Sequence, residues 1–178
     1  MKEQGEANAL VLQLSALPQL RDLPASDLAE LVEHTDVLYF GIGAEIFRQG
    51  QPGLTALLLL TGRLEATVLS GDLAVLVGSC HPGEIVGESA LLGREPVRNA
   101  TVRAVEESSG LLLTPGLLDL RQNKAVVLLE QNLVSTLARR VRRSNLAIKQ
   151  AWRQDPDPTP TEAPTLRQRL QGILRELA

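Results

Sequence analysis

The sequence GESALL at residues 87–92 and the sequence RNAT at residues 98–101 stand among short apolar segments separated by glycines. Gly87 ends one of these segments, and the residues after it have room for little more than one helical turn before Gly93. A helix placed in this way exposes the backbone N–H groups of its first turn, and such groups bind anions, phosphate above all. The stretch therefore predicts an anion-binding site.

Arg98 is expected to lie in the strand that follows. Alternation along a strand would place it on the same face as Ala100, Val102 and Ala104, whose side chains are small and apolar. Its guanidinium should therefore point inward, where a charge is costly without a partner. Two partners are open: an anionic ligand, or Glu88 in a structural ion pair that needs no ligand.

Farther out, glycines recur through residues 37–115 and divide them into short segments rich in Val, Leu, Ile and Thr. Such spacing is typical of a β-sandwich or a small barrel. Gly71, between the segments 63–69 and 73–77, predicts a hairpin turn. Apolar residues recur at helical spacing before this region, over residues 10–34, and again after Pro115.

The longest expected helix covers residues 124–153, which contain neither Gly nor Pro. Its first apolar residues, at 126, 129 and 133, should pack on the β-domain. Later ones alternate in steps of three and four, as in a coiled-coil seam, at Val134, Leu137, Val141, Ser144, Ile148 and Ala151. We expect a homodimer through residues 134–151; the alternative is a helix that lies only on its own domain.

Residues 154–165 contain four prolines and should form an extended linker. Residues 166–178 should form a short amphipathic helix, since their leucines and Ile173 share one helical face. That helix would dock on a protein partner, fold back on its own domain, or have no specific role.

Composition excludes several classes of function. The chain has 18 Lys and Arg against 21 Asp and Glu, and this net charge of −3 gives no attraction toward DNA, RNA or an anionic membrane. Its single cysteine rules out an internal disulfide, and its two histidines are too few for a cupin-type metal enzyme. We find no nucleophile–base pair and expect no metal, no cofactor and no catalysis.

The N-terminus lacks the cationic start and long apolar centre of a signal peptide. The longest apolar run, residues 56–60, is far too short to span a bilayer. We therefore expect a cytoplasmic protein without a membrane segment.

The stretches at 87–92 and 98–101 together resemble the phosphate-binding cassette of cyclic nucleotide-binding domains, the family that includes the bacterial catabolite activator protein. Residues 45–53 and 60–64 resemble its early strands and turns, and the similarity covers about residues 17–152. The resemblance implies an α+β fold over residues 1–153: a small antiparallel β-roll, or jelly roll, flanked by N-terminal helices and a long C-terminal helix.

The resemblance also implies a role for each cassette residue. Arg98 would bind the cyclic phosphate, and Glu88 would accept a hydrogen bond from the ribose 2′-hydroxyl. The backbone N–H groups of Ser89 and Ala90 would complete the phosphate cradle after Gly87. Asn99 stands where the family usually has Ser, Thr or Ala, and its side chain would donate to the phosphate.

Alignment of residues 138–140 with the activator's long helix places the base-reading positions at Ser144 and Asn145. Ser144 is also the polar exception in the predicted seam, and a buried hydroxyl there needs a partner, either an adenine edge or a bridging water. The implied ligand is cyclic AMP, with cyclic GMP or a cyclic dinucleotide as the other possibilities.

Transcriptional relatives carry a helix-turn-helix after the long helix, and the short stretch after Trp152 does not fit one. We therefore expect a stand-alone sensor that signals through its C-terminal helices to a protein partner and does not bind DNA directly. The alternative is a non-binding module in which the cassette is a structural ion pair and the seam provides dimerisation.

Overall fold

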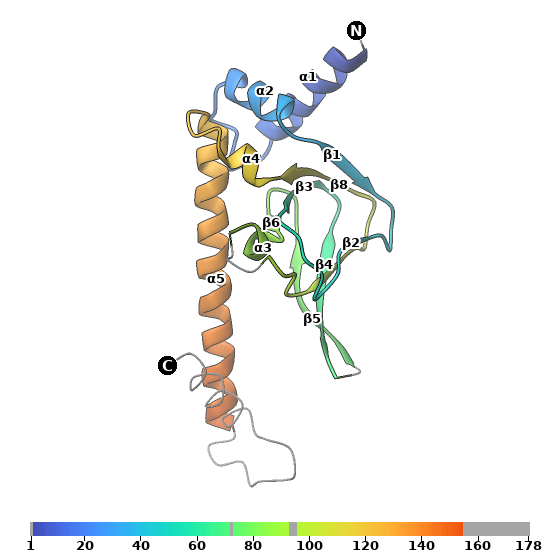
Figure 1. The fold of residues 1–178 in the computed structure, drawn as a ribbon, viewed down its shortest axis with the longest axis vertical. Helices are drawn as coiled ribbons and strands as arrows, with labels where there is room; N and C mark the ends of the chain where they lie inside the picture. The colour runs from blue at the N-terminus through green and yellow to red at the C-terminus, as the bar shows by residue number, and fades with distance from the viewer. Residues whose placement is uncertain (1, 72, 93–95, 155–178) are drawn as a thin grey trace. The chain divides into compact units, whose positions relative to one another are not determined.

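The computed structural model describes residues 2–71, 73–92 and 96–154, in two units that divide after Leu137. Strands of the first unit form two antiparallel sheets of four strands each (Figure 1). The order is β1-β8-β3-β6 in one sheet and β2-β7-β4-β5 in the other. The strands are β1 (Val37–Phe40), β2 (Glu45–Phe47), β3 (Ala56–Thr61), β4 (Leu64–Ser70), β5 (Leu73–Cys80), β6 (Ile85–Val86), β7 (Thr101–Ala104) and β8 (Ser108–Leu113).

Two helices precede the strands along the described chain, two follow them, and a short one lies between β6 and β7. They are α1 (Lys2–Ser15), α2 (Ala25–Glu33), α3 (Glu88–Leu92), α4 (Pro115–Leu118) and α5 (Lys124–Gln154). The α+β class, the β-roll, the N-terminal helices and the long C-terminal helix predicted from the sequence are thus confirmed. None of the helices in the described ranges is long and apolar enough to cross a membrane.

Strand β3 is buried along both of its faces, because it lies between two apolar clusters. Leu58 and Leu60 face the cluster formed with the helices, whereas Leu57 and Leu59 face the cluster between the two sheets. This double burial explains the uninterrupted apolar run in the sequence. Full burial of each such leucine contributes about 1.5–3 kcal/mol.

The β4–β5 hairpin turns at Gly71, as predicted. Ser70 pairs with Leu73 across the turn, and Gly71 has a φ of +63°, which glycine adopts without the steric cost of a side chain.

Asn123 joins the start of α5 to α2. Its side-chain oxygen accepts hydrogen bonds from the backbone N–H groups of Ala125 (2.9 Å) and Val126 (3.1 Å), which caps the helix. Its amide group donates to the Asp27 carbonyl at 2.9 Å and to the Glu30 carboxylate at 2.7 Å. The first turns of α5 are therefore held against the N-terminal helices.

The apolar residues of α5 that were predicted to pack on the β-domain do so, because Val126, Leu129 and Leu133 are buried in the helix-side cluster. The second unit, in its described part, is the rest of α5, where Val141 and Leu146 are exposed. The predicted linker at 154–165 and tail helix at 166–178 lie outside the described residues, apart from Gln154 at the end of α5.

Candidate functional site

Arg98 is 6% exposed, as its small apolar companions predicted, but it does not lie in a strand. Strand β7 begins only at Thr101. The backbone N–H of Arg98 donates to the Gln51 carbonyl at 2.9 Å, and its carbonyl accepts from the Gly50 N–H at 2.9 Å. The loop between β2 and β3 therefore holds this segment outside the regular ladder, which corrects the predicted strand.

The guanidinium of Arg98 is held by neighbours on three sides. Nη1 donates to the Thr55 carbonyl at 2.5 Å and to the Gly87 carbonyl at 3.2 Å, and Nη2 donates to the Thr55 hydroxyl at 2.9 Å. The ring of Phe47 lies against its flat face, 3.7 Å from Cζ to the ring centroid. This packing gives the side chain one defined orientation.

The charge on Arg98 has no carboxylate partner among the ion pairs that the described residues form. An Arg98–Glu88 ion pair, the alternative raised by the sequence, is therefore absent from them. Burial lowers the pKa of Arg98 from its usual value, yet a guanidinium keeps its proton in proteins. The site thus contains a buried positive charge that an anion would stabilise.

Glu88 opens α3 and is completely buried. Gly87, just before it, has a φ of +85°, and a Cβ there would lie 2.7 Å from Nη1 of Arg98 and 2.7 Å from the Phe47 ring. Glycine is therefore required by both the backbone conformation and the available space. It brings the start of α3 directly against the arginine.

The family profile of the cyclic nucleotide-binding domain matches residues 37–118, which include this cluster. These residues form a cyclic nucleotide-binding domain.

Relatives of this domain occur in proteins of several kinds. The catabolite activator protein of Thermus thermophilus is 27% identical, with a TM-score of 0.63 over 75% of this chain and 62% of that one. A cAMP-binding acyltransferase from Mycobacterium smegmatis is 30% identical, with a TM-score of 0.56 over 64% of this chain and 35% of that one. Human cGMP-dependent protein kinase 2 is 29% identical over 102 residues, 56% of this chain but 13% of the kinase. The chain thus matches only a small part of the kinase.

Within the cyclic nucleotide-binding domain, most predicted cassette residues lie in one place. Glu88, Ser89 and Ala90 follow Gly87 in the first turn of α3, where backbone N–H groups have no partner within the helix. Arg98 touches Gly87. Asn99 follows in a bend with its side chain exposed, and no hydrogen bond among the described residues joins that side chain to the cluster.

Ser144 and Asn145 lie on α5 in the second unit, whereas the cassette belongs to the first unit. The side chain of Asn145 is exposed, and that of Ser144 lies outside the described residues. Their role in reading a base therefore stays a prediction.

Sequence reasoning missed Thr55 and Phe47 as parts of the site. Thr55 lies 43 residues before Arg98 and immediately precedes β3. Phe47 ends β2, within a stretch that carried only a family resemblance. A buried arginine needs acceptors, but no local pattern indicates which residue supplies them.

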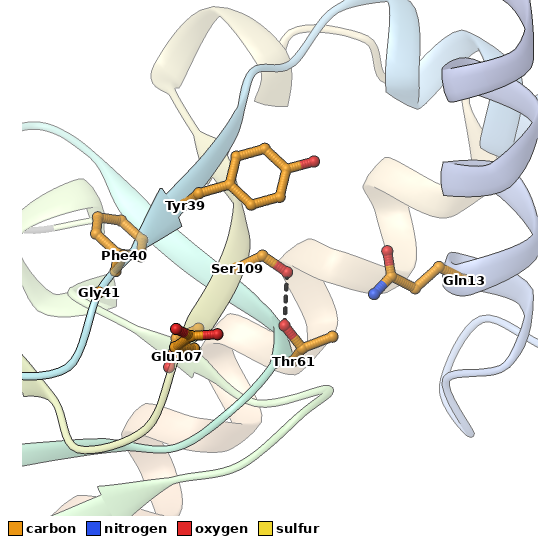
Figure 2. A pocket seen from close by; sticks show the side chains of 8 residues that line it. Gln13, Tyr39, Phe40, Gly41, Thr61, Glu107 and Ser109 are labelled. Atoms are coloured by element: carbon orange, nitrogen blue, oxygen red, sulfur yellow. Dashed lines mark hydrogen bonds between the residues drawn. The ribbon is translucent and has the colours of Figure 1, made fainter.

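A separate hollow of about 560 Å³ opens on the sheet that contains β1, β3 and β8 (Figure 2). The Thr61 and Ser109 hydroxyls hydrogen-bond to each other within it at 2.7 Å. None of the predicted site residues lines this hollow, whose walls are Gln13, Tyr39, Phe40, Gly41, Thr61, Glu107, Ser108 and Ser109.

Proposed function

We propose that this chain is a cytoplasmic regulatory protein that binds a cyclic nucleotide, most favourably cyclic AMP, and catalyses no reaction itself. The observation that carries the proposal is the buried guanidinium of Arg98, oriented by Thr55, Gly87 and Phe47 and not paired with a described carboxylate. The 30% identical relative is a cAMP-binding acyltransferase, which supports cyclic AMP as the ligand. The matched human kinase is cGMP-dependent, which supports cyclic GMP instead.

In this proposal, Arg98 donates to the cyclic phosphate and Glu88 accepts from the ribose 2′-hydroxyl. The N–H groups of Ser89 and Ala90 complete the phosphate cradle, and the side chain of Asn99 adds a donor at its rim. Charge-assisted bonds of this kind contribute about 1.5–3 kcal/mol each. Gly87 leaves the space in which the ligand approaches the backbone.

The base would be read by Ser144 and Asn145 on the α5 helices of a dimer, and the output would pass from these helices to a protein partner. A ligand shifts a helix arrangement only when it binds one arrangement more tightly than the other. A tenfold preference supplies about 1.4 kcal/mol.

Isothermal titration calorimetry of the full chain tests the proposal. We expect saturable binding of cyclic AMP or cyclic GMP, and much weaker binding of 5′-AMP, which has the same base and sugar but an open phosphate. Cyclic dinucleotides complete the screen. Absence of heat with all cyclic nucleotides at millimolar concentration would overturn the sensor and leave the dimerisation module.

The proposed dimer predicts a second result. Val141 lies in the predicted seam and is 58% exposed, so Val141→Glu should place a charge in the interface and shift the chain to monomer. Sedimentation equilibrium measures this shift.

Leu146→Glu is the matched control, because Leu146 is 59% exposed on the same helix and lies five residues beyond Val141, about 140° around it. It should leave the dimer intact. A monomeric wild type, or equal dissociation by both variants, would contradict the seam.

A further inference from the structure

The two edges of the Arg98 guanidinium differ in how many hydrogen-bond acceptors they meet. A guanidinium has five N–H groups in one plane: an end-on edge across Nη1 and Nη2, and a side-on edge across Nε and Nη2. Thr55 occupies the end-on edge with two acceptors, its carbonyl at 2.5 Å from Nη1 and its hydroxyl at 2.9 Å from Nη2. The second N–H of Nη1 points to the Gly87 carbonyl at 3.2 Å.

The remaining N–H groups belong to the side-on edge. Among the described residues, no acceptor bonds to Nε, and Nη2 bonds only to the Thr55 hydroxyl. Phe47 covers one face of the guanidinium. Beside the side-on edge lies Gly53, where a Cβ would approach Nε to 2.8 Å and Nη2 to 2.7 Å, so no side chain of that residue fills the space.

Thr55 itself is firmly placed. It directly precedes β3, the buried strand of the core, and its β-branched side chain has few rotamers. The backbone of Arg98 is bonded to Gln51 in the same loop. Both ends of the contact between Thr55 and Arg98 are thus held in place.

We propose that Thr55 is a positioning residue, which holds the end-on edge of Arg98 so that its side-on edge faces the two unesterified oxygens of the cyclic phosphate. Two parallel N–H groups match two anionic oxygens of one phosphate. Because the arginine is already oriented, little rotamer freedom is lost on binding. This inference rests on the proposed function and adds a residue to the same site.

Thr55→Val tests the hydroxyl, because it keeps the shape and the backbone carbonyl. We expect the Kd for cyclic AMP to rise about fivefold to tenfold. This is less than the full contribution of one hydrogen bond to a charged group, because Thr55 acts on the ligand only through Arg98. Thr55→Ser restores the hydroxyl and should bind within about threefold of wild type, as expected for a change that keeps the bond. Thr55→Ala provides a second variant without the hydroxyl if Thr55→Val fails to fold.

A spectroscopic readout separates positioning from stability. In ¹H–¹⁵N spectra without ligand, the Nε–H resonance of Arg98, assigned by its loss in Arg98→Lys, should be dispersed in wild type and Thr55→Ser. In Thr55→Val it should move toward those of exposed arginines such as Arg103. An unchanged Kd in a folded Thr55→Val or Thr55→Ala variant overturns the inference, whatever the resonance does. Absence of cyclic nucleotide binding by wild type would instead remove the proposed function.

Discussion

Arg98→Ala is expected to weaken cyclic AMP binding by more than about 100-fold. The variant removes the two N–H groups proposed to meet the phosphate, each bond contributing about 1.5–3 kcal/mol, and every 1.4 kcal/mol is a factor of ten in Kd. It also removes the buried positive charge, so the phosphate would have to leave water without compensation. Calorimetric titration of the purified variant measures the change.

Arg103→Ala is the control for this result. Arg103 lies in β7, close in sequence to Arg98, but its side chain is 54% exposed and pairs with Glu45. Its removal should leave the affinity within about twofold, since exposed ion pairs contribute little.

Loss of Arg98 also leaves the Thr55 and Gly87 carbonyls without their donor. Thermal unfolding must therefore show that the variant is folded. Arg98→Gln, which keeps donor groups without the charge, provides a second variant. Wild-type affinity in either folded protein would eliminate Arg98 as the phosphate ligand.

The second large effect concerns the sugar. If the buried carboxylate of Glu88 accepts from the ribose 2′-hydroxyl, 2′-deoxy cyclic AMP should bind wild type about 10- to 100-fold more weakly than cyclic AMP, the cost of one hydrogen bond to a charged group. Glu88→Gln, which is of similar volume but neutral, should narrow this difference. The ratio of the two Kd values, measured for both proteins, isolates the contact.

Glu107→Gln makes the same chemical change at an exposed glutamate outside the cassette. It should preserve the full discrimination between the two ligands. A Glu88→Gln protein that discriminates as strongly as wild type would show that the ribose is read elsewhere. If both ligands bind more weakly but the ratio of their Kd values is unchanged, Glu88 stabilises α3 and does not contact the ribose.

Much of this site was accessible from the residues themselves. The small apolar companions of Arg98 indicated that it is buried, and Gly87 indicated a close approach of the backbone at the start of α3. Both signals are local, because burial and left-handed backbone conformation follow from a few neighbouring residues. The prediction that Arg98 lies in a strand was nevertheless wrong, since its backbone forms hydrogen bonds with Gln51 and Gly50 in a loop rather than with a neighbouring strand.

The partners of Arg98 could not be found in this way. Thr55 precedes β3 and Gly87 follows β6. These two strands are neighbours in the sheet, although the 23 residues 62–84, which include β4 and β5, separate them along the chain. Asn123 is a similar case, because its contacts to Asp27 and Glu30 reach across more than 90 residues. Hydrogen bonds of this kind depend on which strands and helices become neighbours.

By itself, the order of apolar, glycine and charged residues determined the helical ends, the short strands between them, the hairpin at Gly71, the long C-terminal helix and the burial of Arg98. These depend on periodicity and on backbone preferences that act over a few residues. Only the tertiary structure decided that Thr55 and Phe47, and not Glu88, hold the guanidinium. A buried charge requires acceptors of correct geometry, and the folding of distant segments around it selects which ones it meets.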